Sequence, residues 1–145
     1  MTANTQPIFS LKGDQSTDLS TGMGTHLLTA TGDYTGVSAN HVLVYTANAT
    51  DGGYLEGIWF TPEGTNTASV ARVYINNGSS NTTATNNRYL GAQTLPATTA
   101  TNVAAESRIF FPMGIALKAG FRVYAGLGTT VAAGWVACPQ AGQYS

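Results

Sequence analysis

The stretch that decides the fold class is Ser69–Ile75, SVARVYI, in which apolar side chains alternate with larger or polar ones. Successive side chains of a β-strand point to opposite faces. The odd-numbered residues from Ala71 to Ile75 would therefore share one face, and the even-numbered residues would share the other. The sequence Asn76-Asn77-Gly78 follows at once, and Asn and Gly tolerate the positive φ that tight turns need. This pattern predicts a half-buried strand that ends in a turn.

Strand-like runs recur on both sides of this stretch, and none has the 3.6-residue period of a helix. The other predicted strands are Pro7–Lys12, His26–Ala30, His41–Ala47, Tyr54–Thr61, Arg88–Leu95, Ser107–Phe111, Met113–Lys118, Phe121–Leu127 and Val131–Cys138. The last two are expected to form a hairpin through Gly128–Thr130. About eight strands at this spacing predict an all-β, single-domain antiparallel β-sandwich of the jelly-roll type. An immunoglobulin-like sandwich is the nearest alternative.

Three segments fall outside this pattern. Residues 1–12 are either an extended N-terminal arm or the first strand of the domain, which spans 1–145. Gly13–Gly36 is expected to be a long loop or a subunit-contact segment. Asn76–Asn87, NNGSSNTTATNN, contains no large apolar residue and is expected to be an exposed loop.

Low charge excludes several classes of partner. Charged residues make up 9% of the chain, with 6 basic and 7 acidic side chains, against about 25% in an ordinary soluble domain. No basic patch large enough for a phosphate backbone is expected, so no nucleic-acid partner is expected. The longest weakly polar run, Val131–Cys138, is far shorter than the roughly 20 residues of a bilayer span, so no membrane partner is expected. Low net charge favours association between copies, which suits a subunit packed against neighbours.

Chemistry-bearing residues are sparse and unpaired in the sequence. His26 and His41 lie in no metal-binding spacing, and Cys138 is the single cysteine. Glu56 and Glu63 flank one predicted strand, but the sequence alone cannot bring them to the separation that a glycosidase needs. No nucleophile elbow or Walker sequence occurs. We therefore expect no enzyme activity, no catalytic residue, no metal and no cofactor.

The two tryptophans are the remaining candidates for a binding surface, since flat rings stack on the apolar faces of sugars. Trp59 lies in YLEGIWF and Trp135 in VAAGWVAC. Both contexts are apolar and typical of sandwich cores, so both rings are expected in the core rather than in a ligand platform.

Three stretches resemble small virion structural proteins of tailed bacteriophages. They are GTNTASVARVYINNGS at Gly64–Ser79, NNRYLGAQTLPATT at Asn86–Thr99 and LKAGFRVYAGLGTTVAAGW at Leu117–Trp135. The resemblance extends over roughly Val42–Tyr144 and includes the ending in which a Gly-Trp strand precedes Gly142 and Tyr144. None of these motifs is a catalytic signature, and Gly13–Ala39 does not take part.

The resemblance implies a capsid decoration, or cement, protein that binds the outer surface of the capsid and stabilises the head. The expected partners are further copies of the chain, as a homotrimer, and the major capsid protein. The expected location is the outer capsid surface of the virion, after synthesis in the host cytoplasm. Alternatives are a receptor- or glycan-binding module of a tail or head fibre, or a tail or connector component. The expected assembly contacts are Ile8, Phe9, Phe110, Phe111 and Tyr144.

Overall fold

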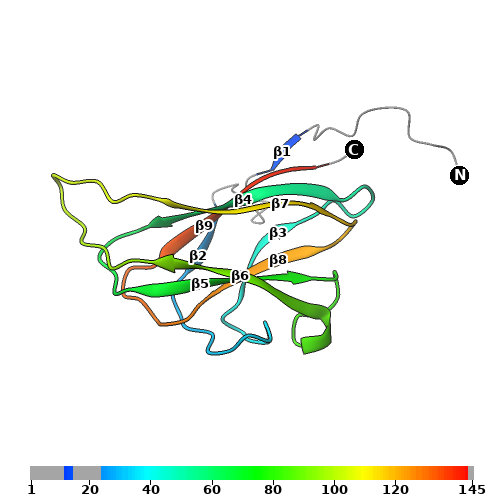
Figure 1. The fold of residues 1–145 in the computed structure, drawn as a ribbon, viewed down its shortest axis with the longest axis horizontal. Helices are drawn as coiled ribbons and strands as arrows, with labels where there is room; N and C mark the ends of the chain where they lie inside the picture. Colours follow the sequence, from blue (N-terminus) through cyan, green and yellow to red (C-terminus); the bar gives the residue numbers. More distant parts are fainter. Residues whose placement is uncertain (1–11, 15–23, 144–145) are drawn as a thin grey trace, which may run out of the picture.

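The computed structural model describes residues 12–14 and 24–143, and these form an all-β structure (Figure 1). Its strands are β1 Lys12–Asp14, β2 Thr25–Leu27, β3 Val42–Thr46, β4 Gly53–Pro62, β5 Ser69–Asn76, β6 Asn87–Leu95, β7 Ile109–Leu117, β8 Arg122–Leu127 and β9 Trp135–Gln143. The described part of the chain contains no α-helix, and a 3₁₀ turn at Ala84–Asn86 lies in the exposed loop expected at 76–87. The all-β prediction is confirmed.

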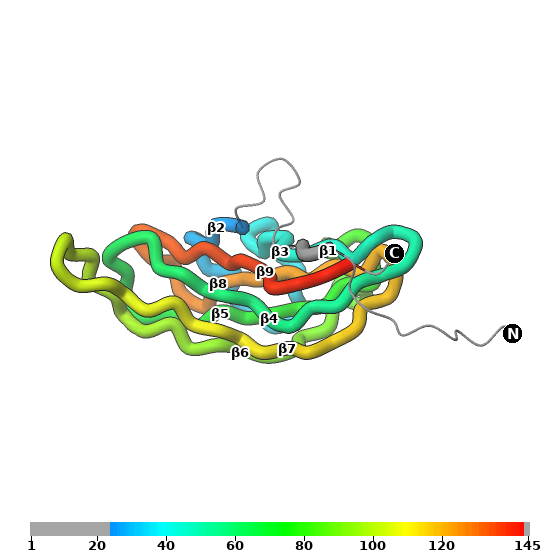
Figure 2. Tube along the Cα trace, turned by 90° about the horizontal axis from the view of Figure 1, so that it is seen from above, coloured from blue at the N-terminus to red at the C-terminus, as the bar shows by residue number. Residues whose placement is uncertain are grey.

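The strands form two antiparallel sheets that pack face to face. The first sheet has the order β1-β9-β4-β7, and the second has the order β3-β8-β5-β6. The short strands β1 and β2 pair with opposite ends of β9, where Lys12 faces Gln143 and Thr25 faces Ala137. In Figure 2 the molecule is seen from above, and β6 and β7 lie along the same side of the sandwich. The antiparallel β-sandwich expected from the sequence is therefore confirmed.

The core lies between the sheets and is built from the inward face of each strand. Its largest fully buried side chains include Trp135, Tyr45, Phe60, Leu55 and Ile58. Hydrophobic burial is the main source of stability in a chain with few charges and a single cysteine.

Strand β5 has the two faces that its sequence predicts. Ala71 and Val73 are fully buried in the core, and Arg72 lies on the opposite face. Tyr74 also lies on that opposite face, yet it is buried, because residues 28–40 cover this side of the second sheet. Part of the segment expected to be a loop at 13–36 thus packs against the protein's own sheet.

Two details of the predicted strands are wrong. Phe121–Leu127 and Val131–Cys138 do not form a hairpin, because β8 and β9 belong to different sheets. Between them Val131 is buried, and its N–H donates to the carbonyl of Leu28, so the chain crosses from one sheet to the other. The two strands predicted around Pro112 are one strand, β7, because an edge strand tolerates a residue without an N–H.

Candidate binding face around Trp59

Trp59 lies on the outer face of the first sheet and not in the core, so the expectation for this residue is wrong. Strand β4 turns Leu55, Ile58 and Phe60 inward, and the register of β4 shifts between Leu55 and Gly57. This irregularity shifts by one residue the alternation of side chains between the two faces of β4. The partly exposed Trp59 therefore points outward. The expectation for Trp135 is confirmed, since that ring is fully buried.

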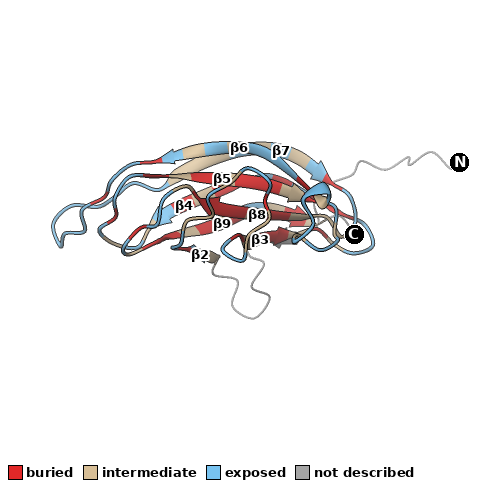
Figure 3. Ribbon diagram, turned by 90° about the horizontal axis from the view of Figure 1, so that it is seen from below, coloured by how far each residue is buried: buried red, intermediate tan, exposed pale blue. Residues whose placement is uncertain are grey.

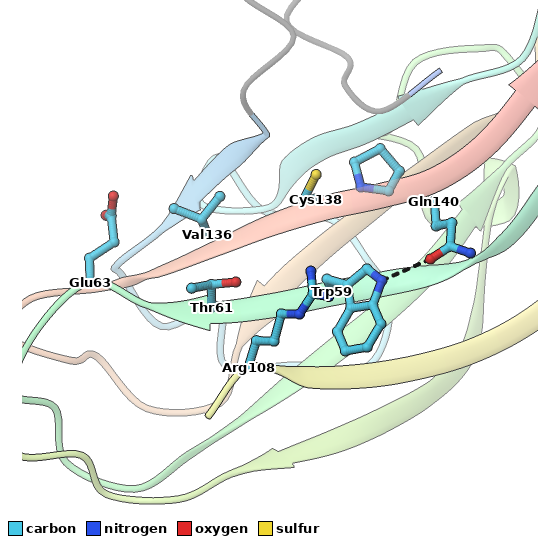
Figure 4. A pocket seen from close by; sticks show the side chains of 8 residues that line it. Trp59, Thr61, Glu63, Arg108, Val136, Cys138 and Gln140 are labelled. Atoms are coloured by element: carbon cyan, nitrogen blue, oxygen red, sulfur yellow. Dashed lines mark hydrogen bonds between the residues drawn. The ribbon is translucent and has the colours of Figure 1, made fainter. Parts of the chain in front are cut away.

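A chain of hydrogen bonds fixes the indole of Trp59. Its Nε1–H donates to Oε1 of Gln140 at 2.9 Å. The Nε2–H of Gln140 donates in turn to the carboxylate of Glu56. Figure 4 shows the indole lying across β4 with Gln140, on β9, at its nitrogen end. The amide and the carboxylate therefore have defined orientations beside the ring.

Two residues of the neighbouring segment pack against the same indole. The guanidinium carbon of Arg108 lies 3.9 Å from the centre of the indole ring, a cation–π contact. The ring of Phe110 lies 4.7 Å away and is tilted by 40°. Phe110 also covers Gly57, where an added Cβ would come within 2.3 Å of its ring. Glycine at this position lets Phe110 lie flat on the sheet beside Trp59.

A shallow depression of about 500 Å³ opens beside the indole (Figure 4). Its lining comes from β4 and β9 and from the residues just after β4 and just before β7: Trp59, Thr61, Glu63, Arg108, Val136, Cys138, Pro139 and Gln140. Cys138 is partly exposed on this face, and burial raises the pKa of its thiol, an effect that Arg108 partly offsets. The thiol is therefore protonated at neutral pH and is a poor nucleophile.

A contact between two surface side chains, His26 and Glu63, borders the depression. Nε2 of His26 lies 2.7 Å from a carboxylate oxygen of Glu63, and about half of each side chain is exposed. Pairs this exposed contribute little stability. Their effect here is to place donors and acceptors at the rim of the depression.

The carboxylates of this face do not form a glycosidase pair. Glu56 and Glu63 are seven residues apart along one extended strand and its end, which corresponds to roughly 20 Å at the rise of a β-strand. Glycosidases need their two carboxyl groups within roughly 5–10 Å. The described residues also contain no group of three or more His, Cys, Asp or Glu side chains that could hold a metal ion. Among the described residues this face therefore presents neither a glycosidase pair of carboxylates nor a cluster of metal ligands.

A second aromatic cluster lies on the outer face of the second sheet, under residues 28–40. The His41 and Tyr74 rings meet edge to face at 4.6 Å, and the Tyr74 hydroxyl donates to the carbonyl of Asp33 at 2.8 Å. Tyr34 and Tyr89 contact one another edge to face, and Arg72 stacks on Tyr34. The cluster fastens the covering segment to the sheet.

Burial shifts two pKa values in this cluster. Desolvation lowers the pKa of His41, an effect that Asp33 opposes and Arg72 reinforces. Desolvation also raises the pKa of Tyr74 to about 12. Neither ring nitrogen of His41 makes a hydrogen bond of good geometry, although the backbone of Gly36 lies close enough to favour its charged form slightly. The surroundings of His41 therefore favour its uncharged form.

The structure describes two of the five expected assembly contacts, Phe110 and Phe111. Ile8, Phe9 and Tyr144 lie outside the described residues. Phe110 and Phe111 are neighbours on β7 but point to opposite sides of it. Phe110 packs on Trp59 outside the sheet, whereas Phe111 packs against the core near Gly91 of β6.

Sequence analysis missed Arg108, Gln140, Glu56 and Glu63 as members of one surface. They are brought together by the pairing of β4 with β7 and β9, which are distant in sequence. The only signal along the chain was Gly57, a glycine inside a strand pattern, which often marks a bulge or a close approach.

Comparison with known proteins does not assign this chain to a family. No protein-family model matches the chain, and no curated protein or solved structure matches it. None of the described residues belongs to a helix long and apolar enough to cross a membrane.

Proposed function

We propose that this protein is a non-enzymatic structural subunit of a bacteriophage virion, a capsid decoration protein that binds the outside of the shell as a homotrimer. The resemblance of Gly64–Ser79, Asn86–Thr99 and Leu117–Trp135 to phage structural proteins supports this function. The strand order supports the finer assignment as a jelly roll, because consecutive strands cross repeatedly between sheets β1-β9-β4-β7 and β3-β8-β5-β6.

The open side of the sandwich is the observation that favours assembly. Strands β6 and β7 are both nine residues long, both lie at a sheet edge, and they share one side of the molecule. Figure 3 shows β6 largely exposed, and Tyr89 and Leu90 on it are each about two-fifths exposed. Arg88 is the one charged residue within the two strands.

Long edges with few charges are templates for pairing with another chain, and monomeric proteins usually protect their edges with charges, prolines or bulges. Pro112 removes one donor from the middle of β7, whereas β6 contains no proline but shifts its register against β5 at Leu90. In the proposed trimer this side is buried between copies, and the capsid contact lies elsewhere on the subunit. Three copies then convert modest contacts with the shell into strong attachment.

The first test is the mass of the protein in solution. A trimer is expected for the full chain, and Leu90→Lys should reduce it to a monomer by placing a charge in the edge. Ala49→Lys, at an exposed turn on another part of the fold, should leave the trimer intact. A native chain that stays monomeric at micromolar concentration would contradict the assembly.

The second test uses phage particles that lack the protein. A decoration protein is dispensable for shell geometry, so these particles should assemble normally but lose resistance to heat and osmotic shock. Particles that keep their robustness yet fail to adsorb to cells would replace the decoration function with that of a receptor-binding fibre.

A further inference from the structure

We propose that the face around Trp59 binds a neutral saccharide, an activity beyond the structural role above. The site consists of Trp59 as the stacking platform, Gln140 and Glu56 as the polar groups beside it, and the depression that reaches Thr61 and Glu63. The bound group would place its apolar C–H face on the part of the indole that Arg108 and Phe110 leave uncovered. Its hydroxyls would lie toward the amide and the nearer carboxylate.

The platform is prepared before any ligand arrives. Its nitrogen is held by Gln140, its ring is packed by Phe110, and Phe110 is accommodated by Gly57. Ordering a large side chain on binding costs affinity, and a ring already fixed avoids that cost. The face of an aromatic ring carries partial negative charge, which attracts the weakly positive C–H groups of a sugar.

The polar groups suit hydroxyls. The Glu56 carboxylate accepts hydrogen bonds, whereas the Gln140 amide and the Thr61 hydroxyl can each donate and accept. Neighbouring sugar hydroxyls also donate and accept, so an amide next to a carboxylate can satisfy two of them. A depression of about 500 Å³ lies within the usual size range of small-ligand sites.

The charges favour a neutral ligand. Glu56 and Glu63 contribute two negative charges, Arg108 contributes one positive charge, and His26 is paired with Glu63. Because the two carboxylates lie at opposite ends of the face, an acidic oligosaccharide that spans it would meet both of them, with Arg108 as the one permanent cation to balance them. Neutral hydroxyls meet no such penalty.

The same charges disfavour a protein as the occupant. The centre of a protein interface is depleted in Glu and other charged residues. Here Glu56 and Glu63 lie toward the two ends of the face, and Arg108 lies against the indole between them. A protein partner would have to desolvate all three without an evident set of partners for them.

The test begins with the labelled full chain on an array of neutral and acidic oligosaccharides. We expect binding to neutral glycans with little binding to their sialylated counterparts. Trp59→Ala should weaken the binding of the best neutral glycan about tenfold or more, as loss of a stacking ring does elsewhere. Gln140→Ala should weaken it several-fold by releasing the indole.

Tyr34→Ala is the matched control, because Tyr34 is an exposed aromatic ring on the opposite face that also stacks with an arginine. Its affinity should stay within twofold of the native value. In the native protein the glycan should also protect Trp59 fluorescence from acrylamide, with the buried Trp135 as an internal reference. This measurement does not depend on how any variant folds.

Three results would overturn the proposal. They are no neutral glycan bound above background, preference for acidic glycans, and unchanged affinity in a folded Trp59→Ala protein. If Trp59→Ala instead abolished attachment to phage particles while glycans were ignored, the face would be a protein contact and the saccharide site would be rejected. None of these results depends on whether the protein forms a trimer.

Discussion

Asn66 should be among the most destabilising positions at which to replace a polar residue. It is buried in the turn after β4, where its Oδ1 accepts from the N–H groups of Ala133 at 2.9 Å and Gly134 at 2.8 Å. Its Nδ2 donates to the carbonyl of Gly134 at 3.0 Å, with longer contacts to Gly64 and Thr98. Its backbone pairs with that of Thr98 in both directions. One side chain thus joins three connecting loops.

The cost of Asn66→Ala follows from these contacts. Each of the three shorter side-chain hydrogen bonds contributes about 1 kcal/mol net, and the buried Gly134 N–H is left without this acceptor. We expect the free energy of unfolding to fall by about 3 kcal/mol. For a chain of this size, that loss lowers the melting temperature by roughly 6–12 °C.

Urea unfolding followed by circular dichroism measures this loss. Asn77→Ala is the control, since Asn77 is exposed and also takes part in side-chain hydrogen bonds. Its effect should stay below about 0.5 kcal/mol, as for most surface substitutions. If Asn66→Ala lost less than about 1 kcal/mol, or no more than Asn77→Ala, the assignment of Asn66 as the link between the loops would be wrong.

Three further outcomes are expected. Because burial lowers the pKa of His41 below its ordinary value of 6.5, the unfolded chain binds the proton more readily, and the melting temperature should fall as pH drops below about 6.5. His41→Leu should abolish this dependence, and a melting curve that is flat between pH 7.5 and 5 would contradict it. Absorbance titration should find that Tyr74 ionises near pH 12. Stability should therefore decline between about pH 10 and 12, and Tyr74→Phe should remove both effects. Gly57→Ala should displace Phe110, shift the fluorescence of Trp59 and cost about 1–3 kcal/mol through overpacking; an unchanged spectrum and melting temperature would show that the ring accommodates the methyl group.

The fold class could be predicted from the sequence because it depends on local alternation. The pattern of Ser69–Ile75 correctly assigns the faces of β5, and most predicted strands lie within a few residues of the observed ones. The prediction failed where tertiary pairing decides. Nothing local shows that the chain between β8 and β9 crosses to the other sheet instead of turning back.

The candidate binding face around Trp59 was not predicted from the sequence, again because it depends on how the strands pair. Apolar neighbours placed Trp59 in the core, but the register shift near Gly57 changes which side chains of β4 point outward. A bulge changes the face of a side chain without changing the composition around it. The partners of Trp59 come from strands more than 40 residues away in the sequence, so only the sheet topology brings them together.

The two outer faces of the sandwich now have different roles. The second sheet is covered by residues 28–40, which use Tyr74 and His41 to hold their place. The first sheet leaves Trp59 partly exposed, with its orientation fixed by Gln140. Because the indole is partly exposed, it contributes less to stability than a fully buried indole would. Its fixed orientation lowers the entropic cost of binding a ligand.

The side formed by β6 and β7 lies across the sandwich from β1 and β2, whereas Trp59 lies on the outer face of the first sheet. Pairing of copies along β6 would therefore leave β4 and β9, and most of the Trp59 site, accessible. A trimer would then carry three equivalent saccharide sites on one particle. Weak binding at each site would be multiplied by their joint attachment, as long as the spacing of the glycans on the cell surface matches that of the sites. Leu90→Lys, which should prevent trimerisation, should accordingly weaken attachment to a glycan-coated surface. It should leave the affinity for a single soluble glycan unchanged. An equal loss in both measurements would show that the β6 edge and the Trp59 site are not independent.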